Sequence, residues 1–130
     1  MADVNRGNRP LSPHLQVYRL PLAAITSIMT RITGHALVAG IVLITWWLVA
    51  AVTSPGAFAV ADWVVRSWLG FIILTGSMWA LWYHLLAGLR HLAYDAGYGL
   101  EIEEARKSSQ ALIAGSVVLA VLTLIVFFVF

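Results

Sequence analysis

The chain has 130 residues, of which 61% are hydrophobic and 11% charged, and it contains no cysteine. A water-soluble domain of this length needs far more charge to cover its surface, so the composition indicates an integral membrane protein. The absence of cysteine excludes disulfides, cysteine-ligated iron–sulfur clusters and covalently attached haem in this chain. The net charge of +2 gives no indication of nucleic-acid binding.

Three apolar runs, at residues 32–52, 67–89 and 111–130, are long enough to cross a membrane. A helix needs about 20 residues to span a hydrocarbon core of about 30 Å. We therefore expect an all-α membrane protein with a single domain over residues 1–130. It should contain a polar segment over 1–21 and three transmembrane helices over about 22–52, 67–96 and 109–130.

The positions of the basic residues predict the orientation. Seven of them precede the first apolar run or separate the second from the third, whereas Arg66 alone lies in the other connection. The seven are Arg6, Arg9, Arg19, Arg31, Arg90, Arg106 and Lys107. The positive-inside rule then places the N-terminus in the cytoplasm. We expect neither a cleaved signal peptide nor a mitochondrial presequence, because about 20 rather polar residues precede the first run. This pattern favours a multi-pass protein of a bacterial inner membrane.

Polar residues gather at the end of the second run, in HLLAGLRHLAYDAG at 84–97. His84, Gly88, His91 and Asp95 are spaced i, i+4, i+7 and i+11, so they share one face of a helix. Six residues separate His84 from Arg90, which places its Cα about 9 Å deeper than the expected membrane interface. An imidazole at that depth suits an axial ligand of haem iron, and Gly88 leaves room for a porphyrin edge. His91 could hydrogen-bond a haem propionate or carry protons. The alternative is that His84 only hydrogen-bonds a neighbouring helix.

A second polar pair, Ser27 and Arg31, is spaced i, i+4 near the start of the first helix. A hydroxyl beside a fixed cation suits a head group that carries carbonyl oxygens. The alternative is a snorkelling arginine beside a helix-packing serine. His35 lies about one turn deeper than Arg31 and is a competing haem-ligand candidate.

Three motifs in this chain resemble the cytochrome b membrane-anchor subunits of succinate dehydrogenase. RPLSPHLQVYRLP at 9–21 resembles the family's N-terminal segment, which reads RPLSPH followed shortly by Tyr. SIMTRITG at 27–34 resembles S-I-x-H-R-x-T-G, and HLLAGLRHLAYDAGYGL at 84–100 resembles H-x-x-x-G-x-R-H-L-x-x-D-x-G. The motifs occur in family order and cover essentially the whole chain.

The resemblance implies that His84 is an axial ligand of haem b and that Ser27 and Arg31 line the ubiquinone site. It also implies that Arg31 lies near the haem propionates, where His91 is a further candidate for a propionate or proton path. Thr30 stands where the family usually has His, which leaves the role of that histidine open. The implied partners are a second small membrane subunit that donates the opposing haem ligand, an iron–sulfur subunit and a flavoprotein subunit.

We therefore predict a membrane anchor of succinate:ubiquinone oxidoreductase that catalyses nothing alone. With its partners it would pass electrons from succinate to quinone in the tricarboxylic acid cycle and the respiratory chain. Three alternatives stay open: a fumarate reductase anchor, a self-contained b-haem carrier that uses His84 with His35, and a purely structural or transport subunit. His84 and His91 do not suit opposing ligation, because two turns separate them by about 10 Å along the helix axis.

Overall fold

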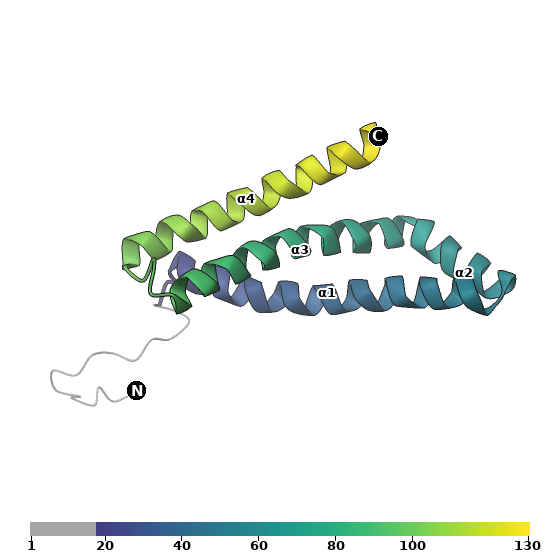
Figure 1. Cartoon of the computed structure of the whole chain (residues 1–130), viewed down its shortest axis with the longest axis horizontal. Helices are drawn as coiled ribbons and strands as arrows, with labels where there is room; N and C mark the ends of the chain where they lie inside the picture. Colours follow the sequence, from purple (N-terminus) through teal and green to yellow (C-terminus); the bar gives the residue numbers. More distant parts are fainter. Residues whose placement is uncertain (1–17) are drawn as a thin grey trace, which may run out of the picture.

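The structure is a computed structural model that describes residues 18–130, so most of the expected polar segment and of the first motif lies outside it. The described chain forms four helices: α1 (Leu22–Thr53), α2 (Pro55–Arg66), α3 (Trp68–Asp95) and α4 (Ile102–Val129) (Figure 1). Of these, α1, α3 and α4 are long and apolar enough to cross a membrane. The expected all-α architecture with three spanning helices is confirmed.

The bundle is a long antiparallel hairpin with a third helix laid against it. α1 and α3 lie side by side, and the short α2 joins them at one end (Figure 1). α4 returns beside α3 and diverges from it toward the C-terminus. We call the end where α1 begins, α3 ends and α4 begins the basic end. Its basic residues are Arg19, Arg31, Arg90, Arg106 and Lys107.

Local sequence explains the helix ends at both turns. α1 stops before Ser54-Pro55, because proline disfavours helical geometry in the residue before it. The Ser54 side chain then caps α2 by accepting from Ala57 N at 3.1 Å, and Ser67 caps α3 in the same way. At the basic end, α3 stops before Gly97 and Gly99, whose φ angles of 82° and 76° suit glycine.

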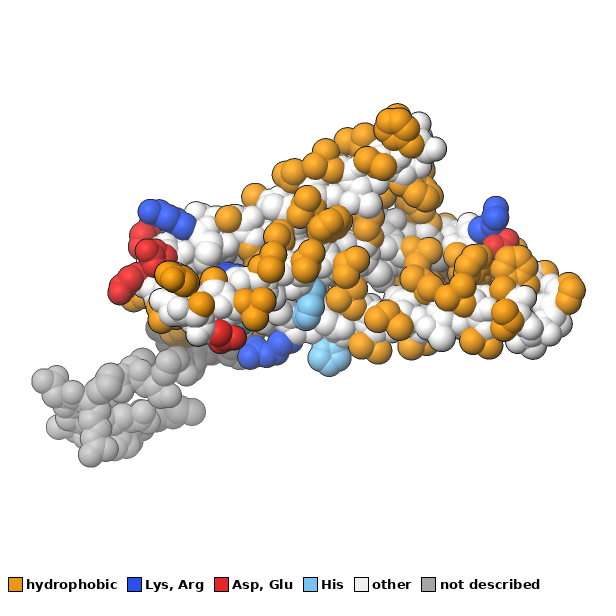
Figure 2. Space-filling view, in the orientation of Figure 1, with side chains coloured by type: hydrophobic (Ala, Val, Ile, Leu, Met, Phe, Trp, Pro, Cys, Tyr) orange, Lys and Arg blue, Asp and Glu red, His pale blue; other side chains and the backbone are white. Residues whose placement is uncertain are grey.

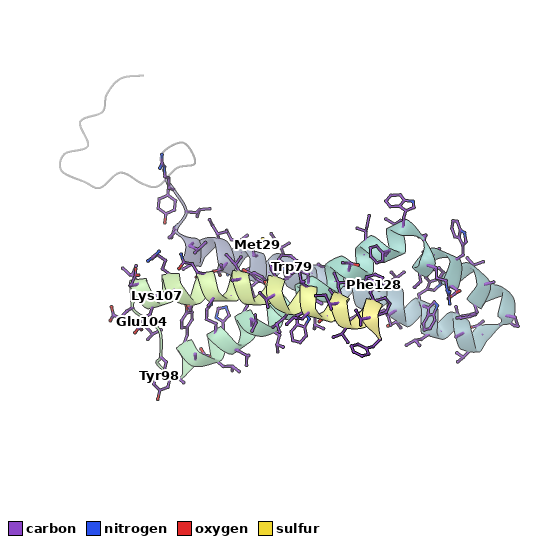
Figure 3. All side chains as sticks on the ribbon, turned by 90° about the horizontal axis from the view of Figure 1, so that it is seen from above. Met29, Trp79, Tyr98, Glu104, Lys107 and Phe128 are labelled. Atoms are coloured by element: carbon purple, nitrogen blue, oxygen red, sulfur yellow. The ribbon has the colours of Figure 1, made fainter. Side chains whose placement is uncertain are left out.

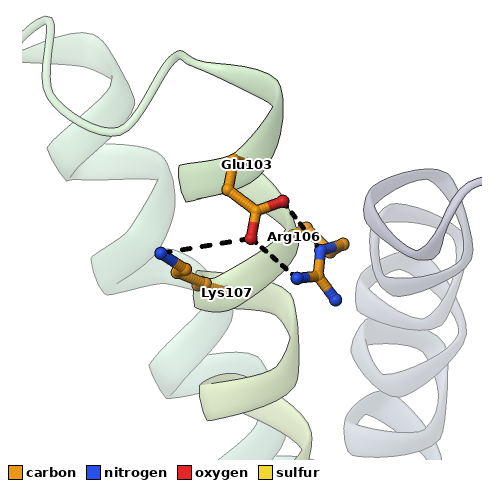
Figure 4. A network of polar contacts seen from close by, with 3 residues as sticks. All are labelled: Glu103, Arg106 and Lys107. Carbon is orange, nitrogen blue, oxygen red and sulfur yellow. Dashed lines mark hydrogen bonds and ion pairs between the residues drawn. The ribbon is translucent and has the colours of Figure 1, made fainter.

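α4 begins earlier than the apolar pattern suggested, at Ile102 rather than about residue 109. Its first turns carry a small ionic network in which Arg106 bonds Glu103 at 2.7 Å and Lys107 lies 4.0 Å from the same carboxylate (Figure 4). These side chains are spaced i, i+3 and i, i+4, which stabilises a helix in a polar setting. The connection between α3 and α4 is therefore short and covers only residues 96–101.

The interior of the bundle is small and contains many polar atoms, whereas the surface is largely apolar (Figure 2). Tyr83, Ala87 and Leu112 form the buried apolar cluster, and Met29 and Trp79 pack against it (Figure 3). The other tight contacts use alanine, glycine, serine and threonine, as is common between membrane helices. An apolar exterior of this kind suits lipid or further membrane helices.

Introduced cysteines can test the predicted orientation, because the chain has none of its own. Gly56→Cys and Glu104→Cys would place a thiol at exposed positions on opposite ends of the bundle. In intact spheroplasts we expect a membrane-impermeant maleimide to label Gly56→Cys, and to label Glu104→Cys only after permeabilisation. The opposite labelling pattern would contradict an N-terminus in the cytoplasm, and both variants must label in detergent as a control.

Candidate functional site

One face of α1 carries a row of threonines toward α3. We call Thr26, Thr30 and Thr33, spaced i, i+4 and i+7, the threonine stripe. Thr26 and Thr33 are fully buried. Each hydroxyl donates to a carbonyl about one turn earlier in α1, at 2.9 to 3.0 Å, so the stripe satisfies its own donors. The oxygen atoms of these threonines can then accept hydrogen bonds from side chains of α3.

His84 crosses from α3 to this stripe and is half-buried between the two helices. Its Nδ1 lies 3.1 Å from the carbonyl oxygen of Thr30, with the Thr33 hydroxyl at 3.5 Å. A carbonyl oxygen can only accept a hydrogen bond, so Nδ1 carries the proton and donates it. In the neutral ring Nε2 then keeps its lone pair, which is the state in which an imidazole binds a metal ion.

Gly34 provides the space for the His84 ring. A β-carbon at this position would lie 3.2 Å from Cε1 of His84, closer than ordinary packing allows. Gly88, by contrast, faces open space, with nothing within 4 Å of a β-carbon placed there. Gly34 therefore fixes how closely the ring approaches α1, and Gly88 leaves the next turn of α3 uncovered.

An open groove of about 370 Å³ contains the exposed side of His84. Its lining residues come from α1 and α3 and are Thr30, Arg31, Gly34, His35, Val38 and His84. The space-filling view shows histidine side chains beside a basic side chain on a largely apolar face (Figure 2). The groove thus brings together Arg31 and His84, two predicted site residues that are far apart in the sequence.

Ser27 and His91 do not line this groove. Ser27 lies one turn before Arg31 on α1 and is half-buried. His91 is exposed on α3, and its ring packs edge-on against Tyr94 at 6.1 Å. Both lie near the basic end. Ser27 precedes the groove residues of α1, and His91 follows His84 on α3.

His35 lines the groove but is more exposed than His84. Its Nδ1 lies 2.8 Å from the carbonyl oxygen of Arg31, so this ring also donates through Nδ1, and in its neutral form Nε2 has a free lone pair. The tautomer therefore does not separate the two histidines as metal ligands. Their surroundings do, because His84 is held between two helices whereas His35 contacts only its own helix in the described hydrogen bonds.

Arg90 has a different environment from the one expected. We counted it with the basic residues between the second and third apolar runs, near the end of the helix expected over 67–96. It lies inside α3, as that range predicts, but it is only 9% exposed. Its Nη1 donates to the hydroxyls of Thr26 at 3.0 Å and Ser109 at 2.8 Å, which lie on α1 and α4. The helical spacing of the threonine stripe was the one signal in the sequence that pointed to a polar contact there.

Comparison with known proteins shows the family to which this chain belongs. Residues 5–123 match the family model described as succinate dehydrogenase/fumarate reductase transmembrane subunit. The chain is 97% identical to the succinate dehydrogenase cytochrome b556 subunit of Paracoccus denitrificans over the full length of both chains. It is 34% identical to the subunit of the same name from Rickettsia conorii, with 88% of this chain and 89% of that one covered.

A mitochondrial relative is also similar. The succinate dehydrogenase cytochrome b560 subunit of Sus scrofa is 39% identical over 78% of this chain and 61% of its own length.

The fold and the groove define a polytopic helical membrane protein with a histidine and arginine site near one end. The chain belongs to the family of succinate dehydrogenase/fumarate reductase transmembrane subunits. This confirms the predicted membrane subunit, a part of the enzyme that is not itself catalytic, and the predicted multi-pass inner-membrane location.

Proposed function

We propose that this chain anchors a succinate:ubiquinone oxidoreductase in the membrane, holds haem b through His84 and forms part of the ubiquinone site with Ser27 and Arg31. The observation that carries the proposal is the His84 ring, which donates through Nδ1 to the Thr30 carbonyl and turns Nε2 away from it. The two relatives named cytochrome b556 subunits support the same assignment.

The residues around His84 suit a bound haem. A second hydrogen bond from the ligand imidazole to a backbone carbonyl is the usual way in which proteins orient such a ring and raise its basicity. Arg31 lines the same groove and supplies a cation for a propionate. When bound, haem b supplies a one-electron carrier at this end of the bundle. This chain supplies the ligand, its orientation and part of an apolar wall.

Arg31 and Ser27 suit the head group of a quinone. The Arg31 guanidinium is exposed, and the Ser27 hydroxyl is one turn away on the same helix. Both can donate hydrogen bonds to carbonyl oxygens, and the positive charge of Arg31 favours negatively charged, reduced forms of the head group. Arg31 and Ser27 lie at the basic end, so protons can reach the head group from water, while an isoprenoid tail stays in lipid.

The groove is open on one side, and this supports a shared cofactor. Val38 at the rim is 61% exposed and Ile41 beyond it is 63% exposed, so an apolar surface continues past the site. A second small membrane subunit would cover this surface and donate the opposing histidine. The flavoprotein and iron–sulfur subunits would dock at the basic end, in the cytoplasm.

Two related functions share the same chain geometry. A fumarate reductase anchor would run the reaction in reverse, and its direction depends on the potentials of partner subunits and quinone. A self-contained haem carrier would use His35 opposite His84, and both of these residues line the groove. Comparison of His84 and His35 variants distinguishes the shared from the self-contained arrangement.

Replacement of His84 should remove the haem. In the purified complex, we expect His84→Leu to abolish or strongly disturb the b-type band of the reduced-minus-oxidised spectrum, because the axial ligand is lost. His35→Leu and His91→Leu are matched controls and should keep the band. An unchanged spectrum in His84→Leu would rule out His84 as the ligand, and an equal loss in His35→Leu would favour the self-contained carrier.

Gly34→Ala should displace the His84 ring without removing it. The new methyl group would lie 3.2 Å from Cε1, so the ring must tilt away from the Thr30 carbonyl. We expect lower haem content or a shifted spectrum at unchanged subunit content. Gly76→Ala is the control, since nothing lies within 4 Å of its added methyl group. Identical spectra for the two variants would contradict close packing of Gly34 on His84.

Arg31→Leu should lower quinone reduction by the complex without lowering its succinate oxidation. We expect quinone reduction to fall by about tenfold or more, the effect of losing one charge-assisted hydrogen bond, while succinate oxidation by a soluble dye is retained. Arg66→Leu removes an arginine from the opposite end of the bundle and should change neither activity. Equal loss of both activities in Arg31→Leu would indicate a structural role instead.

A further inference from the structure

Arg90 is a buried cation whose charge is not matched within the described chain. The residue is 9% exposed, and no carboxylate of residues 18–130 lies within the 4.0 Å of an ion pair. Its Nε is buried without a hydrogen-bond partner in the same part of the chain. Burying a charge beside neutral groups is costly, so a neutral side chain would serve better if filling space were the only requirement.

The contacts of Arg90 join all three spanning helices at the basic end. From α3, Nη1 donates to Thr26 of α1 and to Ser109 of α4, and the guanidinium lies 5.6 Å from the centre of the Tyr94 ring. The hydroxyls of Thr26 and Ser109 are themselves 3.3 Å apart, which closes the triangle. A planar guanidinium can bridge two helices in this way with little loss of side-chain freedom.

The contacts of Thr26 extend this hydrogen-bond network along α1. Its carbonyl oxygen accepts from Tyr83 Oη of α3 at 3.0 Å and from the Thr30 hydroxyl at 2.9 Å. Thr30 in turn accepts from His84. With Thr26 and Thr30 held toward α3, helix geometry turns the residues that follow them, Ser27 and Arg31, by about 100° onto the neighbouring face. The rotation of α1 about its axis therefore depends on these contacts.

We propose that Arg90 is a positioning residue for the quinone-binding face of α1: through Thr26 it fixes the rotation of the helix that presents Ser27 and Arg31. The inference rests on the proposed function, because it assumes that Ser27 and Arg31 bind the quinone. It requires no contact between Arg90 and the quinone. Arg90 and Thr26 should then act as one unit in quinone binding.

The test uses the intact membrane complex with a short-chain ubiquinone. We expect Arg90→Gln to raise the KM for quinone by about tenfold, the effect of a displaced Arg31 that loses one charge-assisted hydrogen bond to the head group, with a smaller change in kcat. Dye-linked succinate oxidation should be retained. Arg90→Lys, which keeps the charge and can reach one hydroxyl, should restore part of the affinity. Arg106→Gln, an exposed cation on α4, is the control and should match the wild type.

Coupling to Thr26 provides the decisive comparison. Thr26→Val should reproduce the raised KM, and the Arg90→Gln/Thr26→Val double variant should be no worse than either single variant. A normal KM in Arg90→Gln, or additive effects in the double variant, would overturn the proposal. If Arg90→Gln does not assemble, normal KM values in both Arg90→Lys and Thr26→Val would overturn it equally.

Arg31→Leu, measured beside these variants, separates the two proposals. If Arg31→Leu reduces quinone normally, the quinone site itself is wrong and the role of Arg90 falls with it. If Arg31→Leu is impaired but Arg90→Gln and Thr26→Val have normal KM values, only the role of Arg90 is wrong.

Discussion

The bilayer offers no partner to a polar side chain, so the polar groups of this bundle must satisfy one another between its helices. Four of the hydrogen bonds between helices lie at one place, the contact between α1 and α3 near the basic end. There the threonine stripe of α1 receives Tyr83, His84 and Arg90 from α3. The contacts that remove unpaired polar groups from the membrane are the same ones that orient the imidazole. Stability and site geometry therefore depend on a single set of hydrogen bonds.

This arrangement gives a physical meaning to Thr30, the residue at which the chain departs from the usual family motif. The group that orients His84 is the backbone carbonyl of residue 30, which any amino acid provides. The threonine side chain turns back to the Thr26 carbonyl instead of entering the contact with His84. The orientation of His84 is thus independent of a histidine at position 30. What is lost with that histidine is a titratable group beside Arg31.

Hydropathy and charge were enough to predict the three spanning helices, because long apolar runs have few other stable structures. The start of α4 was harder, since its first turns are held by the Glu103 ion pairs rather than by apolar residues. The spacing of His84, Gly88 and His91 predicted a shared face of α3, and of these three residues only His84 lines the groove. It could not show that Gly34 and the Thr30 carbonyl complete the site. The polar residues near the start of α1 fall on more than one face, so the sequence does not decide which of them turns toward α3. The burial of Arg90 was missed because an arginine near a helix end ordinarily reaches water.

The position of the groove at one end of a bundle that spans the membrane has an energetic consequence. Arg31 and His84 lie in the half of the bundle that contains the N-terminal part of α1 and the C-terminal part of α3. A proton that enters there from the nearer aqueous phase crosses only a small part of the transmembrane field. Moving one charge through the whole field costs about 2.3 kcal/mol per 100 mV. The chemistry proposed for this groove would therefore be largely insensitive to the membrane potential, and it would neither store energy in that potential nor draw on it.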